Sequence, residues 1–289
     1  MEEAILKTLI YYDIFDYPLK SWEIHKWLFG FKVNLNEMEV PLRSLLSQKK
    51  IVYFKGYFFL KGREILVSRR IRKEKNAQRF LSKARFAANA LRLVPTIKLL
   101  GLSGSLAMSV ADKHDDIDFF IICSSKRIWL TRLLAMTILE ILGLRRRRSD
   151  SRERAIGKVC LNLFMEESSL ELKSHDLYTA HEILQLKMFW QRQEFFQKFL
   201  FANDWSFQLL PNWISSERAC KLPKKKKSWA IVNPIMDGLE SLAKSLQKGA
   251  TQVQGDEVIE ATALFFHPED QRPRVMDEYH KKLKRYRLS

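Results

Sequence analysis

Hydrophobic residues recur along the chain at two spacings, one typical of helices and the other of strands. Near the N-terminus they lie three or four residues apart, which places them on one face of a helix. This spacing predicts helices over 3–13, 21–30 and 36–46. Two short β-rich runs follow, 51–54 and 57–60, separated by Lys55-Gly56. The N-terminal pattern therefore predicts three helices and then a β-hairpin.

The segment 61–75 is strongly basic, and helical spacing of apolar residues continues beyond it to Leu91. Pro95 ends this amphipathic segment because proline cannot continue a helix. A run of cations on a helix forms either a solvated face or a stripe that binds phosphate groups, and the sequence leaves both interpretations open. The helix is expected to pack on the sheet that follows it.

The middle of the chain changes to short, continuous apolar runs, which are typical of buried strands. These strands are predicted at Ile97–Leu102, Ile117–Cys123 and 158–165, with a helix over 128–142 between the last two. Beyond residue 170 the sequence predicts helices over 177–201, 234–246, 256–266 and 274–286. The fold class predicted is α+β, with a mixed sheet flanked by helices and a C-terminal helical region.

Basic residues exceed acidic ones by 50 to 33, which gives a formal net charge of +17. A surface with this charge attracts polyanions, so DNA or RNA is a candidate partner. Cations are densest in one short stretch, which forms either an exposed loop or a clamp for an acceptor phosphate or RNA. The stretch contains Arg145, Arg146, Arg147, Arg148, Arg152 and Arg154.

The chain has three widely spaced cysteines, Cys123, Cys160 and Cys220, which do not suggest a disulfide framework or a zinc knuckle. A reduced, cytoplasmic compartment is therefore expected. The N-terminus carries acids and lacks the pattern of a secretion signal. Arg132 and Glu140 interrupt the apolar run 128–144, so we expect a buried helix there and no membrane span, with a helix lying on a membrane surface as the alternative.

Candidate chemistry lies between the first two central strands. Gly104 lacks a Cβ where the backbone has to approach another group, and Ser105 follows it at the start of a helix whose amides attract phosphate. Asp116 and Asp118 are two residues apart on a strand, so both carboxylates project from one face. Since Mg²⁺ is commonly held by one or two carboxylates together with substrate phosphates, this pattern predicts metal-assisted phosphoryl or nucleotidyl transfer.

Gly104-Ser105, a spacer of ten residues, and Asp116-Ile117-Asp118-Phe119 together resemble the signature of the polymerase-beta-like nucleotidyltransferase superfamily. The resemblance implies that the Gly-Ser turn contacts the triphosphate of an NTP and that the two aspartates hold Mg²⁺ or Mn²⁺. It also implies a third carboxylate on the next strand, where Asn162 is the corresponding residue. An amide carries no charge and accepts no proton at neutral pH, so this departure bears on catalysis rather than on the fold. His114 is either a mobile base or a solvated loop residue.

The N-terminal helices and hairpin resemble a winged helix, in which Arg43, Lys49 and Lys50 could contact nucleic acid or a protein. The order of segments is similar to that of nucleotidyltransferase-domain proteins, with a winged-helix-like domain at 1–62, a linker helix and core at 63–170, and a helical domain at 171–289. The expected function is transfer of an NMP group from Mg-NTP to an acceptor hydroxyl on a nucleic acid, a protein or a small molecule. The alternative is a catalytically weak or inactive protein of this fold that regulates by binding nucleic acid.

Overall fold

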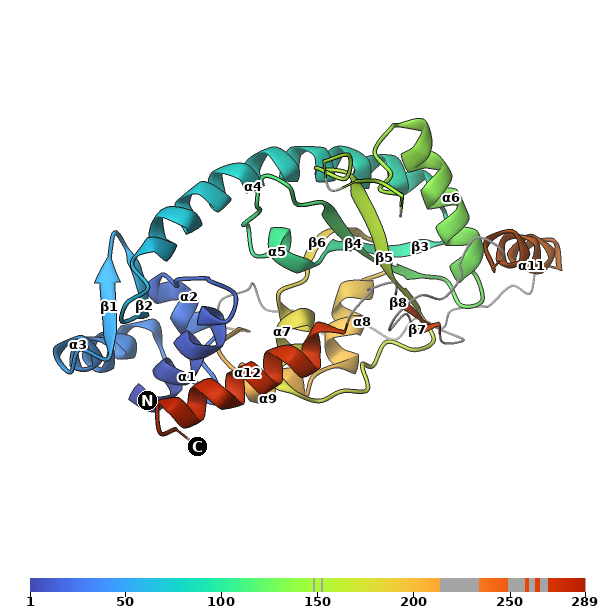
Figure 1. The fold of residues 1–289 in the computed structure, drawn as a ribbon. Coiled ribbons are helices and arrows are strands. Elements are labelled where there is room, and N and C mark those ends of the chain that lie inside the picture. Colours follow the sequence, from blue (N-terminus) through green and yellow to red (C-terminus); the bar gives the residue numbers. More distant parts are fainter. Residues whose placement is uncertain are drawn as a thin grey trace.

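The computed structural model describes residues 1–147, 149–151, 153–213, 234–248, 258–259, 263–265 and 270–288. Its N-terminal part consists of helices followed by a hairpin, as the sequence predicts (Figure 1). The elements are α1 (Glu2–Asp13), α2 (Ser21–Lys26), η1 (Leu35–Met38), α3 (Glu39–Ser47), β1 (Ile51–Phe54) and β2 (Tyr57–Leu60). Lys55 and Gly56 form the turn of the hairpin, and both have positive φ angles. Leu19, between α1 and α2, also pairs with Phe58 of the hairpin.

A long helix, α4 (Ile65–Ala90), arches from the hairpin across the sheet (Figure 1). The cations near its start do not form a uniformly solvated face. Arg70 is only 3% exposed and makes an ion pair with Glu23 of α2, with 2.8 Å between the nitrogen and the oxygen. Its guanidinium also lies 3.5 Å from the centre of the Tyr17 ring. This buried pair therefore fixes the start of α4 to the N-terminal helices.

The central sheet is mixed and has the strand order β6-β3-β4-β5-β8-β7. Its strands are β3 (Ile97–Leu102), β4 (Ile117–Cys123), β5 (Val159–Glu166), β6 (Lys187–Gln191), β7 (Val258–Ile259) and β8 (Ala263–Phe265). The strands β4 and β5 are parallel, and the other neighbouring pairs are antiparallel. The short η2 (Leu91–Leu93) precedes β3, and α6 (Ile128–Ile141) makes the crossover from β4 to β5. The predicted α+β class with a mixed sheet flanked by helices is confirmed.

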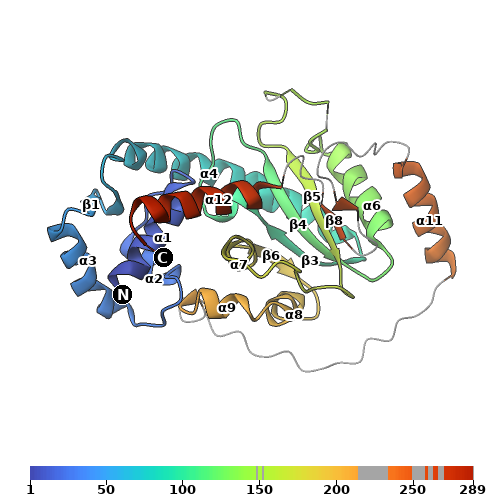
Figure 2. The ribbon, with the colours of Figure 1, turned by 60° about the horizontal axis from the view of Figure 1, so that its bottom comes forward.

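Alternation along the strands divides the side chains of the sheet between two cores. Phe119 and Ile121 of β4 pack with residues of α4 and α6 on one face. Phe120 and Ile122 point to the opposite face, where α7 (Leu177–Leu184) and α8 (Phe195–Ala202) cover the sheet (Figure 2). Asp118 therefore lies on the face toward α7.

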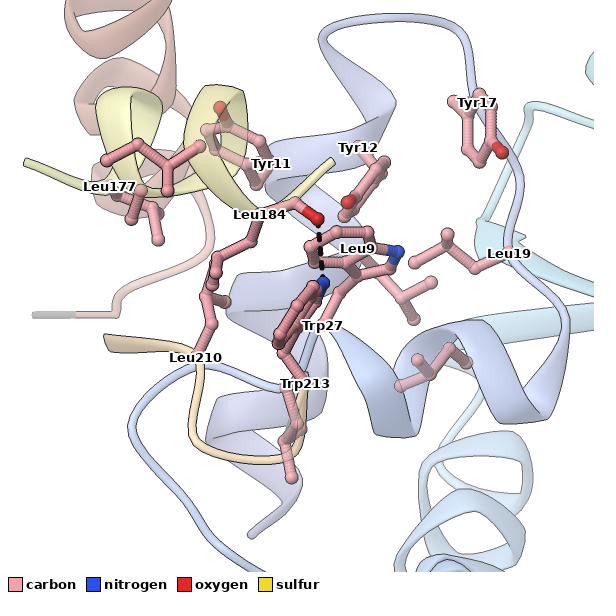
Figure 3. Close-up of a cluster of buried hydrophobic side chains, with 14 of the residues drawn as sticks. Leu9, Tyr11, Tyr12, Tyr17, Leu19, Trp27, Leu177, Leu184, Leu210 and Trp213 are labelled. Carbon is pink, nitrogen blue, oxygen red and sulfur yellow. Dashed lines mark hydrogen bonds between the residues drawn. The ribbon is translucent and has the colours of Figure 1, made fainter. Parts of the chain in front are cut away.

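The core on that face continues into the N-terminal helices, so segments far apart in the sequence share it. Tyr11 and Trp27 pack there with Leu210, which follows α9 (Ser206–Leu209), and with residues of α12 (Gln271–Arg285). Figure 3 shows this cluster and the hydrogen bond from Trp213 Nε1 to the carbonyl oxygen of Leu184, which is 2.7 Å long. The N-terminal helices are therefore packed against α7, the segment after α9, and α12.

Two of the predicted helices are wrong. The segment 177–201 contains α7, then β6, then α8, because β6 pairs with the edge of β3. The described parts of 256–266 form β7 and β8, and β8 pairs with β5. Part of each segment pairs with a strand that lies far away in the sequence. The spacing of apolar residues within a segment does not reveal such a pairing. By contrast, α11 (Pro234–Lys248) and α12 are helices, as predicted.

Among the described helices, none has the length and apolar character needed to cross a membrane. Helix α6 is buried on one side, where Ala135 and Leu139 pack in the core of the sheet, and α11 packs against another side of it. The expected buried helix at this position is therefore present.

Candidate active site

The two aspartates predicted from the sequence meet at the start of β4. Asp118 is the second residue of the strand, and Asp116 directly precedes it. In the parallel pairing of β4 with β5, Asp118 lies opposite Cys160. Oxygen atoms of Asp116 and Asp118 and the sulfur of Cys160 all lie within 4.8 Å of one another. These three groups are close enough to hold one metal ion.

Cys160 is the residue of this cluster that the sequence analysis missed. The resemblance places Asn162, not Cys160, at the third position. The side chain of Asn162 lies outside the described residues. The register of β5 shifts between the partners of Asp118 and Phe120, and a shift of this kind is invisible in the sequence. Strand alternation alone could have placed Cys160 and Asn162 on the same face as candidates, but it could not choose between them.

Gly104 occupies the position at which the backbone approaches Asp118. Its φ angle is +64°, which side chains with a Cβ rarely adopt, and a Cβ added there would lie 3.0 Å from Asp118 Oδ2. The backbone N–H of Ser103 donates to the carbonyl oxygen of Asp118 over 3.0 Å. The Gly-Ser turn is therefore attached directly to the strand that carries the aspartate, as the predicted site requires.

We expect Gly104→Ala to weaken Mg²⁺ binding and to destabilise the fold by about 1–2 kcal/mol, the usual cost of the left-handed conformation for a residue with a Cβ. The metal effect arises because the new methyl group displaces the carboxylate of Asp118. Gly56→Ala is the matched control, because Gly56 has a φ angle of +87° and open space around its Cβ position. Calorimetric Mg²⁺ affinity and the free energy of unfolding separate the two effects. Equal Mg²⁺ affinities in the two variants would contradict this role of Gly104.

Ser105 follows the glycine and is exposed, and its hydroxyl donates to Asp115 Oδ2 over 3.2 Å. The same carboxylate oxygen accepts the backbone N–H of Asp112 over 2.8 Å. These hydrogen bonds hold the acidic loop 112–115 against the Gly104-Ser105 turn. Helix α5 (Gly104–Ala107) has only four residues, so a helix dipole adds little, and phosphate binding would rely on individual backbone N–H groups.

Arg146 provides a cation that already contacts the cluster. Its Nη1 donates to Asp116 Oδ2 and lies 3.7 Å from the sulfur of Cys160. The backbone holds this residue in place, because the Arg146 N–H donates to the carbonyl oxygen of Val159 over 2.9 Å. One positive charge therefore faces both Asp116 and Cys160.

The environment of Asp118 favours its protonated form. Burial, followed by repulsion from the Asp116 carboxylate, raises the pKa of Asp118 to about 7, against the opposing effect of Arg146. Glu182 of α7 also contributes to this rise, and burial raises the pKa of Glu182 itself to about 7. Burial likewise raises the pKa of the Cys160 thiol well above its usual range. The sequence analysis did not identify Glu182, which comes to the site only through the packing of α7 under the sheet.

Mg²⁺ affinity is expected to fall as the pH drops, because the Asp118 carboxyl has to lose its proton to bind the ion. With a pKa of about 7, the protonated fraction grows below neutrality, and the affinity should be about tenfold lower at pH 6 than at pH 8. Isothermal titration calorimetry with Mg²⁺ at both pH values measures the change. An affinity that stays constant over this range would show that Asp118 is ionised throughout or does not bind the ion.

His114 is half-buried, and its Nδ1 atom has no hydrogen-bond partner among the described residues. Its role as a mobile base stays a prediction.

A surface cavity of about 340 Å³ lies between the end of α6 and the arginine-rich loop that follows it. It is lined by Glu140, Gly143, Arg145, Arg147, Asp150, Arg154 and Lys158. Arg145 and Arg147 pair with Glu140, and Lys158 pairs with Asp150. The four cations exceed the two acids, so the cavity favours an anion. Arg148 and Arg152, predicted in the same cluster, lie outside the described residues.

Comparison of the chain with family models, curated proteins and solved structures found no match. Function is therefore inferred from the geometry of the site.

Proposed function

We propose that this protein is a metal-dependent nucleotidyltransferase that transfers the NMP group of an NTP to an acceptor hydroxyl. The observation that carries the proposal is the convergence of Asp116 and Asp118 beside the left-handed turn at Gly104. A Cβ at Gly104 would crowd the Asp118 carboxylate, so glycine lets the backbone of the turn lie close to the metal-binding oxygens. The fold class agrees with a nucleotidyltransferase core, which the resemblance of the motif also suggests.

The donor set fits a divalent cation, because the carboxylates of Asp116, just before β4, and Asp118, within it, lie close together. Asp116 and Asp118 would hold Mg²⁺ or Mn²⁺, which, when bound, neutralises charge on the triphosphate and orients it. Backbone N–H groups at Gly104 and Ser105 would position the phosphates. The acceptor hydroxyl would lose its proton to solvent as its oxygen forms a bond to the α-phosphorus, the bond from that phosphorus to the bridging oxygen would break, and pyrophosphate would leave.

Arg146 is placed to assist the nucleotide, since a guanidinium forms matching bidentate hydrogen bonds with either a carboxylate or a phosphate. In the structure it pairs with Asp116. Binding of a cation by Asp116 would release the guanidinium toward the triphosphate. Arg146 would therefore act as a positioning residue for the phosphates.

Incubation of the full chain with Mg²⁺ or Mn²⁺ and each α-labelled NTP tests the proposal. The expected result is transfer of label to an acceptor from a cell extract, or to the protein itself, together with release of pyrophosphate. Pyrophosphate release that depends on the metal and on one NTP would identify the nucleotide. Absence of nucleotide binding and of label transfer with all four NTPs, tested with Mg²⁺, Mn²⁺, Zn²⁺ and Co²⁺, would reject the function.

A non-catalytic regulator that binds nucleic acid is the second candidate, and the N-terminal part of the chain favours it. An isolated antiparallel bridge between Leu19 and Phe58 joins the segment before α2 to the two-stranded hairpin, an arrangement similar to a winged helix. Arg43, Lys49 and Lys50 are exposed at α3 and the turn after it. The same surface could serve as an additional contact for a nucleic-acid acceptor of the enzyme.

Nucleic-acid binding by phosphate neutralisation should weaken steeply with salt, with a log-log slope of about −0.9 for each duplex phosphate contacted. We expect Arg145→Ala with Arg147→Ala to reduce the slope by about two units without changing sequence preference. Arg43→Ala should alter preference if α3 contacts bases. Fluorescence anisotropy with DNA and RNA measures both effects. Absence of a complex at micromolar protein and about 0.15 M salt would exclude nucleic acid as a partner and leave a protein or small-molecule acceptor.

A further inference from the structure

Cys160 differs from an ordinary core cysteine in what surrounds its sulfur. Its relative exposure is 9%, yet it belongs to neither of the two apolar cores on the faces of the sheet. The groups near its sulfur are the carboxylates of Asp116 and Asp118 and the guanidinium of Arg146. Cys123 offers the contrast within the same sheet, because it is fully buried within the apolar core on the α4 side.

The position of Arg146 shows how the sulfur and the carboxylate are oriented. The same Nη1 atom donates to Asp116 Oδ2 and approaches the Cys160 sulfur at 3.7 Å. The sulfur and the carboxylate are thus oriented toward a single cation. A metal ion would take over the contacts that the guanidinium makes.

We propose that the Cys160 thiolate is the third protein ligand of the metal site and that the site prefers Zn²⁺ or Co²⁺ to Mg²⁺. This proposal rests on the metal site of the proposed function and names the class of ion that the site binds. Mg²⁺ is bound through oxygen atoms, whereas thiolate together with carboxylate suits ions such as Zn²⁺. An ion at this position also removes the proton from the thiol.

The geometry agrees with such an ion. Donor atoms in a tetrahedral zinc site lie roughly 3.5 Å apart, and the three candidate donors already lie within 4.8 Å of one another. Three protein ligands leave a fourth position for water or a phosphate oxygen, as in catalytic rather than structural zinc sites. A soft ion at this position would hold the nucleotide through that open position.

Titration of the full chain with Co²⁺ under anaerobic, reducing conditions tests the assignment, because a cobalt–thiolate bond gives a charge-transfer band in the near ultraviolet. The wild-type protein should show this band. A variant with Cys123→Ala and Cys220→Ala, which keeps Cys160 as its sole cysteine, should retain the band, and Cys160→Ser should lose it.

Cys160→Ser should also lower the Zn²⁺ affinity by at least about tenfold, since even outer-shell changes around a metal alter affinity by about 10–100-fold. Circular dichroism checks that each variant is folded.

The outcomes separate this inference from the proposed function. Co²⁺ or Mg²⁺ binding that depends on Asp116 and Asp118 but produces no charge-transfer band would reject Cys160 as a ligand and leave the proposed function intact. Wild-type affinity for Mg²⁺ that exceeds the affinity for Zn²⁺ would overturn the preference. If no divalent ion binds the folded wild-type protein, with or without NTP, both proposals fail. Cys160→Asp adds a positive test, because a third carboxylate should shift the preference toward Mg²⁺.

Discussion

Replacing both Asp116 and Asp118 by asparagine is expected to abolish metal-dependent nucleotide binding while the protein stays folded. The two carboxylates are the anionic groups of the cluster, and an amide offers only a neutral oxygen. Since a bound metal contributes several kcal/mol to stabilising charge in phosphoryl transfer, label transfer should fall by at least about a thousandfold. Calorimetry with Mg-ATP and the labelled-NTP assay measure the two effects.

Asp112→Asn is the matched control for the double variant. Asp112 lies in the same acidic loop, but its carboxylate pairs with Lys73 at 2.8 Å and does not belong to the metal-binding cluster. The Asp112→Asn substitution removes a negative charge near the site and should leave metal-dependent nucleotide binding unchanged. The site is assigned wrongly if the folded Asp116/Asp118 double variant binds Mg-ATP as tightly as the wild type does.

The features that could be predicted from the sequence are local ones. The strands around the site were expected because short apolar runs flank the Gly-Ser step and the aspartates. The close approach of the backbone at Gly104 and the common face of Asp116 and Asp118 follow from the properties of glycine and from strand alternation. These features depend on neighbouring residues, so periodicity and residue type are sufficient to identify them.

The features that could not be predicted depend on long-range pairing. Cys160 reaches the aspartates through the register of two parallel strands joined by α6, and Arg146 reaches them from the loop after that helix. The strand β6 looks helical in the sequence because aromatic and aliphatic residues run continuously from α7 to α8. Glu182 was missed for a similar reason: only the packing of α7 on the sheet brings its carboxyl toward Asp118. A pattern within one segment contains no information on these contacts.

The basic segment at the start of α4 shows that the burial and pairing of charged residues also depend on long-range contacts. The sequence suggested a solvated face or a phosphate-binding stripe, and neither describes Arg70. Its side chain is 4% exposed and that of its partner Glu23 is 5% exposed. Arg70 Nε also lies 3.0 Å from Glu74 Oε1, and Nη1 donates to the carbonyl oxygen of Pro18 over 3.3 Å. The residue therefore connects α4, α2 and the segment before α2.

Arg70→Ala is expected to destabilise the protein by about 3–5 kcal/mol, because removal of one partner leaves the Glu23 carboxylate buried without its counter-charge. Arg72→Ala on the exposed face of the same helix is the control, and it should change stability by less than about 0.5 kcal/mol. Urea denaturation followed by fluorescence measures the free energy of unfolding of both variants. Adding Glu23→Leu to Arg70→Ala should recover part of the loss, since no charge of that pair then remains buried. If Arg70→Ala costs as little as Arg72→Ala, the ion pair does not hold α4 on the N-terminal helices.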